Sequence, residues 1–425
     1  MKKVAIIGTG ISGLTCGYLL HKQYDVTLFE ANDYIGGHTA TKDVELNGRQ
    51  YAIDTGFIVF NDWTYPNFNK IMNQIGVNAQ PTEMSFSVKN QAQNLEYNGN
   101  NINSLFAQRR NIFRPRFWRI VTDILKFNKL CKSDDAIQHA EQGMTLFDYI
   151  QHHRLSDDFA QNYILPMCAA IWSMTLEDSK SFPLTFFLQF FNNHGLLNIT
   201  DRPQWYTIIG GSREYIEPLT RDFADKIHLS SPVQNVFKTE HGFTVQVQHA
   251  DDEAVTDYHF DEVIFSCHSD QALQMLQQPT ALQTDILGKI GYAMNEVVLH
   301  TDTSVLPKRP LAWASWNYLI KGEPGEEQAP ASVTYNMNIL QRIQSDTTFC
   351  VTLNNTEALN PDKILGVYHY AHPQFSPEMV RAQQRRDELN DAGDGYFCGA
   401  YWYNGFHEDG VRSALDVCRR LGVEL

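Results

Sequence analysis

Three glycines near the N-terminus have the spacing that brings a phosphate group against the polypeptide backbone. Gly8, Gly10 and Gly13 follow a short apolar run at residues 4–7 and precede an apolar helical pattern that extends to about Leu20. A glycine turn between a strand and a helix directs backbone N–H groups and the positive end of the helix dipole at an anion. This context predicts a dinucleotide-binding site rather than a glycine-rich turn without a ligand.

An acidic residue completes this site at the end of the second predicted strand. Residues 25–29 are largely apolar and lead into Glu30, whose carboxylate can accept hydrogen bonds from both ribose hydroxyls of a nucleotide. A carboxylate at this position disfavours NADP, because it would repel the 2′-phosphate. The residues expected to contact the nucleotide here are Gly8, Gly10, Ile11, Ser12, Gly13, Glu30 and Ala31. They leave NAD and FAD as alternatives.

Composition and charge restrict the class of protein. The chain has 425 residues and a net charge of −15, which argues against nucleic acid as a partner. Its seven cysteines show neither a C-x-x-C pair nor metal-ligand spacing, so we expect reduced thiols and no metal site. A strand predicted directly after Met1-Lys2-Lys3 leaves no room for a signal peptide, and no apolar run is long enough for a transmembrane helix. We therefore expect a cytoplasmic protein.

The order of predicted elements divides the chain into interleaved segments. Strand patterns dominate both ends, and helical patterns fill residues 104–193. We predict a hairpin turning at Asn47-Gly48, a strand over 258–266 and another over 311–320. The predicted fold class is α/β, with a discontinuous Rossmann-like cofactor domain and an α+β substrate domain. The predicted cofactor domain spans residues 1–80, 205–290 and 390–425, and the substrate domain spans 81–204 and 291–389.

Together with the glycine turn and Glu30, further segments resemble the extended fingerprint of the flavin amine oxidase, protoporphyrinogen oxidase and phytoene desaturase superfamily. They are Gly36-Gly37-His38-Thr39, Asp54-Thr55-Gly56, Gly210-Gly211-Ser212, Pro232-Val233 and residues 261–264 and 399–410. The resemblance covers nearly the whole chain, and it implies noncovalent FAD. It assigns further cofactor contacts to Gly36, Gly37, His38, Thr39, Thr55, Gly56, Phe57, Val233, Phe406, His407, Glu408 and Val411.

A closer resemblance is to a bacterial subgroup of FAD-dependent amine-oxidase-like proteins. The shared strings lie at residues 170–173, 299–302, 313–318, 370–373 and 405–410. Members of this subgroup tend to be encoded beside cyclopropane-fatty-acid synthases. The association implies an apolar or lipid substrate, such as an acyl chain that carries a ring or becomes a furan fatty acid. It also implies a synthase of that kind as a partner.

One departure from the superfamily bears on the reaction. Amine oxidases usually carry a lysine near the flavin N5, on the strand that here spans residues 292–301, but this chain has Asn295 or Glu296 at that place. Ordinary amine oxidation is therefore less favoured. A base could instead come from a titratable side chain, because histidine titrates near neutral pH and burial raises the pKa of a glutamate. The candidates are Glu296, His300, His372 and His407.

Each candidate base also has a purely structural interpretation. Glu296 would be an exposed strand residue and His300 a core histidine with its hydrogen bonds satisfied. His372, which precedes Pro373, would be a turn residue, and His407 would pack under the last helix.

A basic and aromatic segment, residues 109–119, stands out in this acidic chain. A helix beginning near Pro115 would place Phe117 on an apolar face, with Arg116 and Arg119 towards another face. Such a helix could lie on the inner face of an anionic membrane with Phe117 and Trp118 at the interface, or it could pack its apolar face into the core. A second aromatic stripe, at residues 182–191, could be part of the core or form the wall of a tunnel for an acyl chain.

These observations predict an FAD-dependent oxidoreductase that dehydrogenates or oxidises an acyl chain of a fatty acid or membrane lipid. Dioxygen or another acceptor would reoxidise the flavin. Three alternatives stay open, namely an amine oxidase, a carotenoid- or porphyrin-type desaturase or isomerase, and a non-catalytic flavoprotein partner of a lipid-modifying enzyme.

Overall fold

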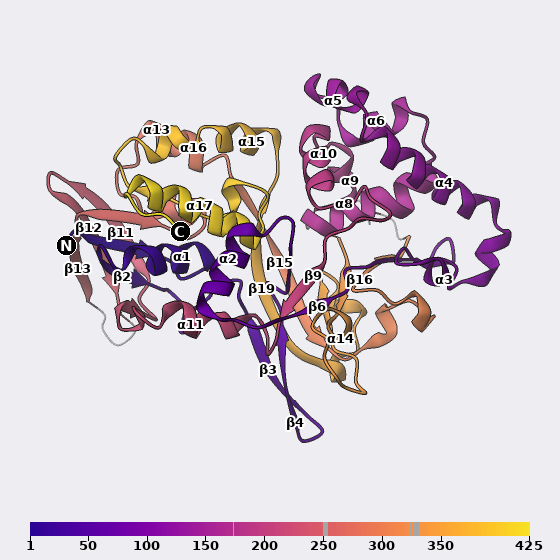
Figure 1. The fold of residues 1–425 in the computed structure, drawn as a ribbon, viewed down its shortest axis with the longest axis horizontal. Coiled ribbons are helices and arrows are strands. Elements are labelled where there is room, and N and C mark those ends of the chain that lie inside the picture. Colours follow the sequence, from indigo (N-terminus) through magenta and orange to yellow (C-terminus); the bar gives the residue numbers. More distant parts are fainter. Residues whose placement is uncertain (173, 250–253, 323–324, 326–327, 329–330) are drawn as a thin grey trace.

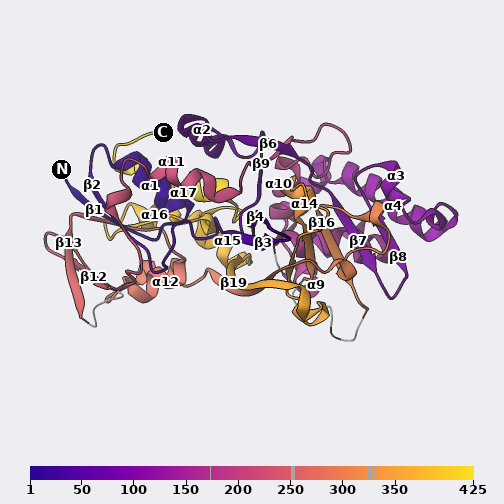
Figure 2. The same ribbon diagram turned by 90° about the horizontal axis from the view of Figure 1, so that it is seen from below.

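The computed structural model describes residues 1–172, 174–249, 254–322, 325, 328 and 331–425. Ser173, the last residue of the shared string at 170–173, lies outside the described residues. Figures 1 and 2 show two halves at opposite ends of an elongated molecule, with long strands between them. Both chain termini lie in one half, and the helices of residues 102–193 lie in the other.

A five-stranded parallel sheet forms the centre of the half that contains the termini. Its strand order is β10-β2-β1-β14-β20. The strands are β1 (Lys3–Ile7), β2 (Asp25–Phe29), β10 (Ile227–His228), β14 (Glu262–Phe265) and β20 (Tyr396–Phe397). Along β1, Val4 and Ile6 enter one apolar core while Ala5 and Ile7 enter another, because successive side chains point to opposite faces. Both faces of the sheet are therefore covered, as is usual for parallel sheets.

Helices cover one face of this sheet, and a small antiparallel sheet and further helices cover the other. The first face carries α1 (Ile11–Leu20), α2 (Pro66–Ile75), α11 (Ile216–Thr220) and α17 (His407–Arg420). The second carries β11 (Val233–Thr239), β12 (Gly242–Gln248), β13 (Val255–Phe260), α12 (Ser269–Met275), α13 (Ala281–Leu287), α15 (Pro377–Gln384) and α16 (Arg386–Asn390).

The predicted single strand over 258–266 is wrong. β13 ends at Phe260 in the antiparallel sheet, and β14 begins at Glu262 in the parallel one. Between them, the Asp261 carboxylate accepts the Lys3 backbone N–H at 2.6 Å. The chain thus changes sheets at a polar residue within an otherwise strand-like sequence.

A seven-stranded sheet forms the middle of the molecule, with strand order β19-β15-β18-β17-β16-β7-β8. Its strands are β7 (Phe86–Asn90), β8 (Leu95–Asn98), β15 (Gly291–His300), β16 (Trp316–Ile320), β17 (Val333–Asn336), β18 (Cys350–Leu353) and β19 (Ile364–Gln374). The strand predicted over 311–320 is shorter than expected, because residues 310–312 form a 3-10 turn that begins at Pro310. β15 and β19 are the long pair that runs between the two halves (Figure 1).

The helical half packs around an aromatic core. It contains α3 (Ile102–Leu105), α4 (Pro115–Leu130), α5 (Asp134–Glu141), α6 (Leu146–His152), α7 (Asp157–Phe159), α8 (Leu165–Trp172), α9 (Leu176–Lys180) and α10 (Leu184–Asn193). The aromatic stripe at 182–191 is part of this core, since Phe187 and Phe191 are almost fully buried. Phe117 is also buried, as the core interpretation of this helix expects and the membrane interpretation does not, whereas Trp118 is exposed.

The remaining elements connect the two halves. They are β3 (Thr41–Leu46), β4 (Arg49–Asp54), β5 (Val59–Asn61), β6 (Ala79–Thr82), β9 (Trp205–Ile208) and α14 (Met337–Leu340). β3 and β4 form the predicted hairpin, whose turn residues Asn47 and Gly48 both have the positive φ of a type I′ turn. All seven cysteines are free, and six of them are buried. The exact domain boundaries given above stay predictions.

Candidate cofactor site and active site

The turn between β1 and α1 has the geometry that an anion requires. Gly8 has a φ of +103°, and a Cβ atom at Gly13 would lie 2.0 Å from the Gly8 carbonyl oxygen. Larger residues are therefore excluded at both positions. A Cβ atom at Gly10, in contrast, would meet nothing within 4 Å. No side chain among the described residues caps the N-terminus of α1, so its first N–H groups face open space at Gly10.

A second glycine loop lies against the first. The backbone N–H of Gly36 donates to the carbonyl of Thr9 at 3.1 Å. Gly37 has a φ of +57°, and a Cβ atom there would lie 3.3 Å from the Gly10 Cα. Both glycines of the 36–37 pair are therefore used for a close approach to the first turn, and the open space at Gly10 is bordered by two backbone segments.

Glu30 is buried, and four hydrogen-bond donors surround its carboxylate. The Thr9 backbone N–H donates at 3.0 Å and its hydroxyl at 2.6 Å. The backbone and side-chain amides of Asn32 donate at 2.9 and 2.8 Å. A ribose hydroxyl would therefore have to replace the Thr9 hydroxyl or the Asn32 side chain at this carboxylate. Sequence reasoning missed both residues, although each lies within two positions of a predicted one.

The neighbouring segments are held in place by backbone hydrogen bonds. The N–H of Glu30 donates to the carbonyl of His228, and the N–H of Ser231 donates back to the Glu30 carbonyl. Ala31 is exposed between these contacts. Val233 begins β11 just beyond them and packs partly into the core on the far face of the sheet.

The N-terminus of α17 meets the N-terminus of α1. The Ser12 hydroxyl donates to the Gly410 carbonyl at 3.0 Å, and a Cβ atom at Gly410 would lie 2.7 Å from the Ile11 side chain. Val411 is completely buried in the core that the two helices share. The structure thus brings Ile11, Ser12 and Val411 together, as expected of residues around one cofactor.

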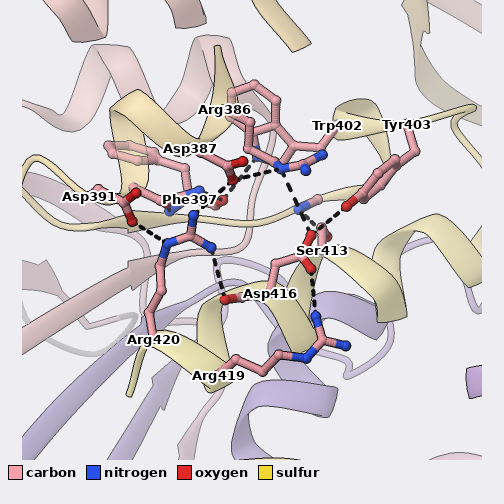
Figure 3. Close-up of polar contacts among 12 residues, drawn as sticks. Arg386, Asp387, Asp391, Phe397, Trp402, Tyr403, Ser413, Asp416, Arg419 and Arg420 are labelled. Atoms are coloured by element: carbon pink, nitrogen blue, oxygen red, sulfur yellow. Dashed lines mark hydrogen bonds and ion pairs between the residues drawn. The ribbon is translucent and has the colours of Figure 1, made fainter. Parts of the chain in front are cut away.

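Charged side chains hold the C-terminal half of α17 in place (Figure 3). Arg420 forms ion pairs with Asp391 at 2.6 Å and Asp387 at 2.8 Å, and both partners belong to α16 or its end. Asp416 accepts a hydrogen bond from the Tyr403 hydroxyl, whose residue precedes α17. The position of the α17 N-terminus is therefore fixed from the opposite end of the helix.

The first turn of α17 does not direct its carboxylates at the glycine turns. Glu408 accepts hydrogen bonds from the backbone N–H groups of Phe68 at 2.8 Å and Asn67 at 3.2 Å, so it caps α2. Asp409 accepts the Phe406 backbone N–H at 2.9 Å and so caps the start of α17 itself. Burial raises the pKa of Asp409 to about 7.

His407 lies in a packed polar network. Its ring stacks on Phe57 with centroids 3.7 Å apart, and its Nε2 is 2.9 Å from the Tyr215 hydroxyl. That hydroxyl also shares a hydrogen bond with Thr39. Burial lowers the pKa of His407 to about 3. These contacts match the packing interpretation of His407, and they link the predicted cofactor residues Thr39 and Phe57 to α17.

Three partly buried histidines form a cluster beside the second glycine loop. The rings of His268 and His372 lie 6.1 and 5.6 Å from that of His38, and the ring of Tyr370 lies at 5.4 Å. Burial is the main cause that lowers the pKa of His38 to about 3 and that of His372 to about 4, and it also lowers the pKa of His268. We call His38, His268 and His372 the histidine cluster. Its rings are neutral at neutral pH.

His372 is the candidate base that the structure places in this cluster. Its Nδ1 lies 3.3 Å from the side-chain amide nitrogen of Asn295, which is almost fully buried. Glu296, the next residue of β15, points to the opposite face and accepts a hydrogen bond from the Thr356 hydroxyl. Asn295 therefore stands at the site, and Glu296 does not.

Two further contacts border the cluster. The Thr55 hydroxyl lies 2.8 Å from that of Tyr370, and a Cβ atom at Gly56 would lie 2.1 Å from the His38 carbonyl oxygen. The Nε2 atom of His38 is buried and has no hydrogen-bond partner among the described residues. The loops at residues 36–39 and 55–57 thus meet beside the His38 Nε2, an atom that could bond to a ligand.

His300 is a core histidine. Its Nε2 lies 2.6 Å from the Thr352 hydroxyl, and its Nδ1 accepts the backbone N–H of Asp302 at 3.0 Å. It is fully buried at the end of β15, in the middle sheet. Both ring nitrogens are satisfied there, as the structural interpretation of this residue expects.

Aromatic contacts join the helical half to this region. The ring centroids of Phe186 and Phe375 lie 4.9 Å apart, and Phe375 is three residues beyond His372. The ring of Phe190 stacks on that of Phe406, with centroids 5.1 Å apart. Phe186 and Phe190 belong to α10. Aromatic packing therefore connects the helical core to the end of β19 and to the start of α17.

The sheet, the two glycine loops and the two converging helix N-termini define a dinucleotide-dependent oxidoreductase. The sequence model of the flavin-containing amine oxidoreductases matches residues 11–338, and the chain belongs to this family. It is an FAD-dependent oxidoreductase of the superfamily that the sequence resembles. The residues present fit FAD, because the space at Gly10 is open, Gly37 lies against Gly10, and Nε2 of the adjacent His38 has no hydrogen-bond partner among the described residues.

Solved structures with this fold have diverse activities. A fatty acid isomerase from P. acnes, named as producing CLA, is 14% identical, with a TM-score of 0.67 over 99% of this chain and 98% of that one. Cyclohexylamine oxidase from Brevibacterium oxydans IH-35A is 13% identical, with a TM-score of 0.66 over 99% of both chains. At such identities the likeness shows the fold alone.

Curated relatives match only short segments. Carotenoid phi-ring synthase of Chlorobaculum tepidum is 32% identical over 77 residues, which are 18% of this chain and 12% of the relative. The 1-hydroxycarotenoid 3,4-desaturase of a Flavobacterium species is 46% identical over 61 residues, which are 14% of this chain and 12% of the relative. This chain therefore matches about an eighth of each relative's length, and their activities are not carried over from these segments.

Proposed function

We propose that this enzyme oxidises a carbon–hydrogen bond in the acyl chain of a fatty acid or membrane lipid. The observation that carries the proposal is the aromatic cluster of Phe186, Phe190, Phe375 and Phe406, in which Phe375 and Phe406 are partly exposed and Phe375 lies three residues beyond His372 of the histidine cluster. An apolar chain suits such an aromatic cluster better than a small polar amine does. The fold also serves a fatty acid isomerase, so it can accommodate an acyl chain.

The residues at the cluster suit the handling of a proton. When bound, FAD supplies the hydride chemistry and passes the electrons to dioxygen or another acceptor. Asn295 donates to Nδ1 of His372, which places the ring proton of neutral His372 on Nε2 and makes this atom a hydrogen-bond donor. Among the described residues Nε2 of His38 has no hydrogen-bond partner, so we assign the acceptance of the substrate proton to His38 and hydrogen-bond donation to His372, although the sequence assigned His38 to the cofactor alone.

Asn295 distinguishes this site from that of the amine oxidases it resembles. The resemblance implies a lysine at this place, and Asn295 is neutral and directed at His372. A neutral amide fixes the orientation of the imidazole without adding a charge beside it. This supports an apolar substrate over an amine.

Anaerobic reduction of the bound flavin tests the proposal. The FAD-loaded protein is mixed with phospholipid vesicles, free fatty acids, mono- and polyamines, and polyenes, and flavin absorbance is followed. We expect bleaching by acyl lipids only. Bleaching by amines with release of peroxide would establish an amine oxidase instead. If no compound bleaches the flavin but a cyclopropane-fatty-acid synthase co-purifies with the protein, a non-catalytic partner role would replace the proposal.

Polyene oxidation is the second candidate function. The matches to two carotenoid enzymes favour it, although they cover short segments. A polyene would suit the same aromatic cluster. Bleaching by polyenes without bleaching by acyl lipids would decide for it in the same experiment.

A further inference from the structure

Four large apolar side chains are exposed on neighbouring segments at the far end of the helical half, where Arg109 of the turn before α4 bonds to Asn103 of α3. Phe113 is 86% exposed and Ile102 is 78% exposed, while Ile112 and Trp118 are both more than 40% exposed. The Trp118 indole N–H donates to the Ile112 carbonyl at 2.8 Å, so these two residues are in contact. We call Ile102, Ile112, Phe113 and Trp118 the apolar tip. Apolar side chains that are grouped in this way mark interaction surfaces more often than single ones do.

The chain around the apolar tip is basic. Residues 97–122 contain five arginines and no aspartate or glutamate, in a chain whose net charge is −15. Arg109 donates to the Phe106 carbonyl, and Arg110 and Arg114 donate to the carbonyl of Asn94. Their hydrogen-bond partners are thus neutral, and among the described residues no ion pair includes these three arginines. The basic charge at this end is therefore not neutralised locally.

The surface differs from the one that the sequence suggests. The apolar face of α4 is turned inward, since Phe117 and Ile120 are buried in the helical core. Arg116 forms an ion pair with Asp158, so it is not available to a partner. The exposed apolar residues lie instead on α3, on the turn that precedes α4 and on the first turns of α4. In Figures 1 and 2, α3 and α4 lie at the end of the molecule opposite its termini.

We propose that the apolar tip and Arg109, Arg110 and Arg114 dock this protein on an anionic lipid bilayer. The arginines would meet phospholipid headgroups while Phe113, Ile102 and Trp118 enter the interface below them. A nucleic acid would engage the arginines but offers no apolar phase for Ile102 and Phe113. No helix among the described residues combines the length and apolar character needed to cross a membrane, so the contact is peripheral.

This inference does not depend on the identity of the substrate. An acyl lipid as substrate would give the docking a purpose, but a protein that oxidises another compound could bind a bilayer in the same way. The test therefore measures binding and not turnover, and its failure would leave the proposed oxidation untouched.

Cosedimentation with vesicles tests the docking. The full FAD-loaded chain is mixed with vesicles of phosphatidylglycerol and phosphatidylcholine, and with phosphatidylcholine alone, at low and high salt. We expect binding to the anionic vesicles that weakens in salt. Arg109→Gln with Arg110→Gln should weaken it about 30-fold, at about fivefold for each arginine. Phe113→Ser with Ile102→Ser should weaken it about tenfold or more, since the apolar contact is lost.

Matched controls separate the tip from the rest of the surface. Arg49→Gln changes an exposed arginine on the β3–β4 hairpin, and Ile209→Ser changes an isoleucine that is 51% exposed elsewhere. Both should bind as the unaltered protein does. The proposal is overturned if the unaltered protein stays in the supernatant, or if the tip variants bind vesicles as the controls do. If only the arginine variant loses vesicle binding, and the unaltered protein binds single-stranded DNA as strongly as it binds anionic vesicles, the site binds polyanions in general and not lipid.

Discussion

Glu408 accepts a hydrogen bond from the backbone N–H of Phe68 at 2.8 Å, although 340 residues separate them in the sequence. The contact joins the first turn of α17 to the first turn of α2. A second contact, from the Ser12 hydroxyl to the Gly410 carbonyl, joins α17 to the start of α1, so the last helix of the chain is bound to two early ones. The cofactor site thus depends on contacts between the two ends of the chain.

Removing this carboxylate should destabilise the protein. Glu408→Ala leaves the N–H groups of Asn67 and Phe68 without their acceptor, and we expect the free energy of unfolding to fall by about 1–3 kcal/mol. Glu408→Gln keeps one acceptor oxygen and should lose less. Urea denaturation of both variants, beside an exposed control such as Glu217→Gln, measures the difference. Equal stability of the alanine and glutamine variants would contradict the capping role.

Two glycines of the first turn should respond differently to alanine. At Gly13 the added methyl group would lie 2.0 Å from the Gly8 carbonyl oxygen, so Gly13→Ala should destabilise the fold itself, by about 1–3 kcal/mol or more. At Gly10 the methyl group meets nothing, so Gly10→Ala should fold normally but lose much of its bound FAD. Thermal unfolding of the FAD-free proteins and FAD content after purification separate the two effects. A normal FAD content in Gly10→Ala would show that the cofactor does not approach this turn.

The local parts of this fold could be predicted from sequence, because they depend on neighbours along the chain. The β1–turn–α1 unit and the Asn47-Gly48 hairpin need only apolar runs and glycines at the right spacing. The break at Asp261 could not be predicted, since the acceptor role of its carboxylate depends on Lys3, 258 residues away. Because residues 258–266 have a continuous strand pattern, the sequence does not show that the chain passes from one sheet to another at Asp261.

The direction of side chains was the weakest part of the prediction. Phe117 and Trp118 are neighbours, yet one is in the core and the other is exposed, and the sequence left open whether this helix faces a membrane or the core. Likewise, Asn295 and Glu296 were equal candidates until the register of β15 against β19 placed Asn295 beside His372. An error of one residue in register reverses such an assignment.

Variants of the histidine cluster should slow flavin reduction selectively. His372→Gln removes the ring that Asn295 orients, and we expect a slowing of about 100-fold, the usual effect of losing one hydrogen-bond donor at the reacting atoms. Glu296→Gln, one position from Asn295 but on the other face, is the matched control and should reduce at the unaltered rate. The rates are measured by stopped flow with the compound that bleaches the flavin in the anaerobic experiment. The FAD content of each variant shows that the cofactor is still bound. Unchanged reduction in His372→Gln would remove this residue from the reaction.

Asp54 should make folding stability depend on pH. It is completely buried and accepts hydrogen bonds from Ser212 and Gln341 at 2.8 Å. Burial raises its pKa from 3.8 to about 6. The folded state therefore holds this proton more tightly than the unfolded state does. The contribution of Asp54 to the free energy of unfolding is complete below pH 3.8. It is lost as the pH rises through about 6, and the loss is up to about 3 kcal/mol.

Two aspartate variants isolate this contribution in urea denaturation between pH 4 and about pH 7. In Asp54→Asn, the free energy of unfolding should no longer fall between pH 4 and about pH 6. The fall due to Asp409 should remain, because burial raises the pKa of Asp409 to about 7. Asp43→Asn is the control, and its stability should change with pH in this range as that of the unaltered protein does. Arg213 lowers the pKa of the exposed Asp43, so that carboxylate stabilises the fold above its unfolded pKa and loses its effect as the pH falls. If Asp54→Asn and the unaltered protein show parallel profiles, the Asp54 carboxyl titrates alike in the folded and unfolded states.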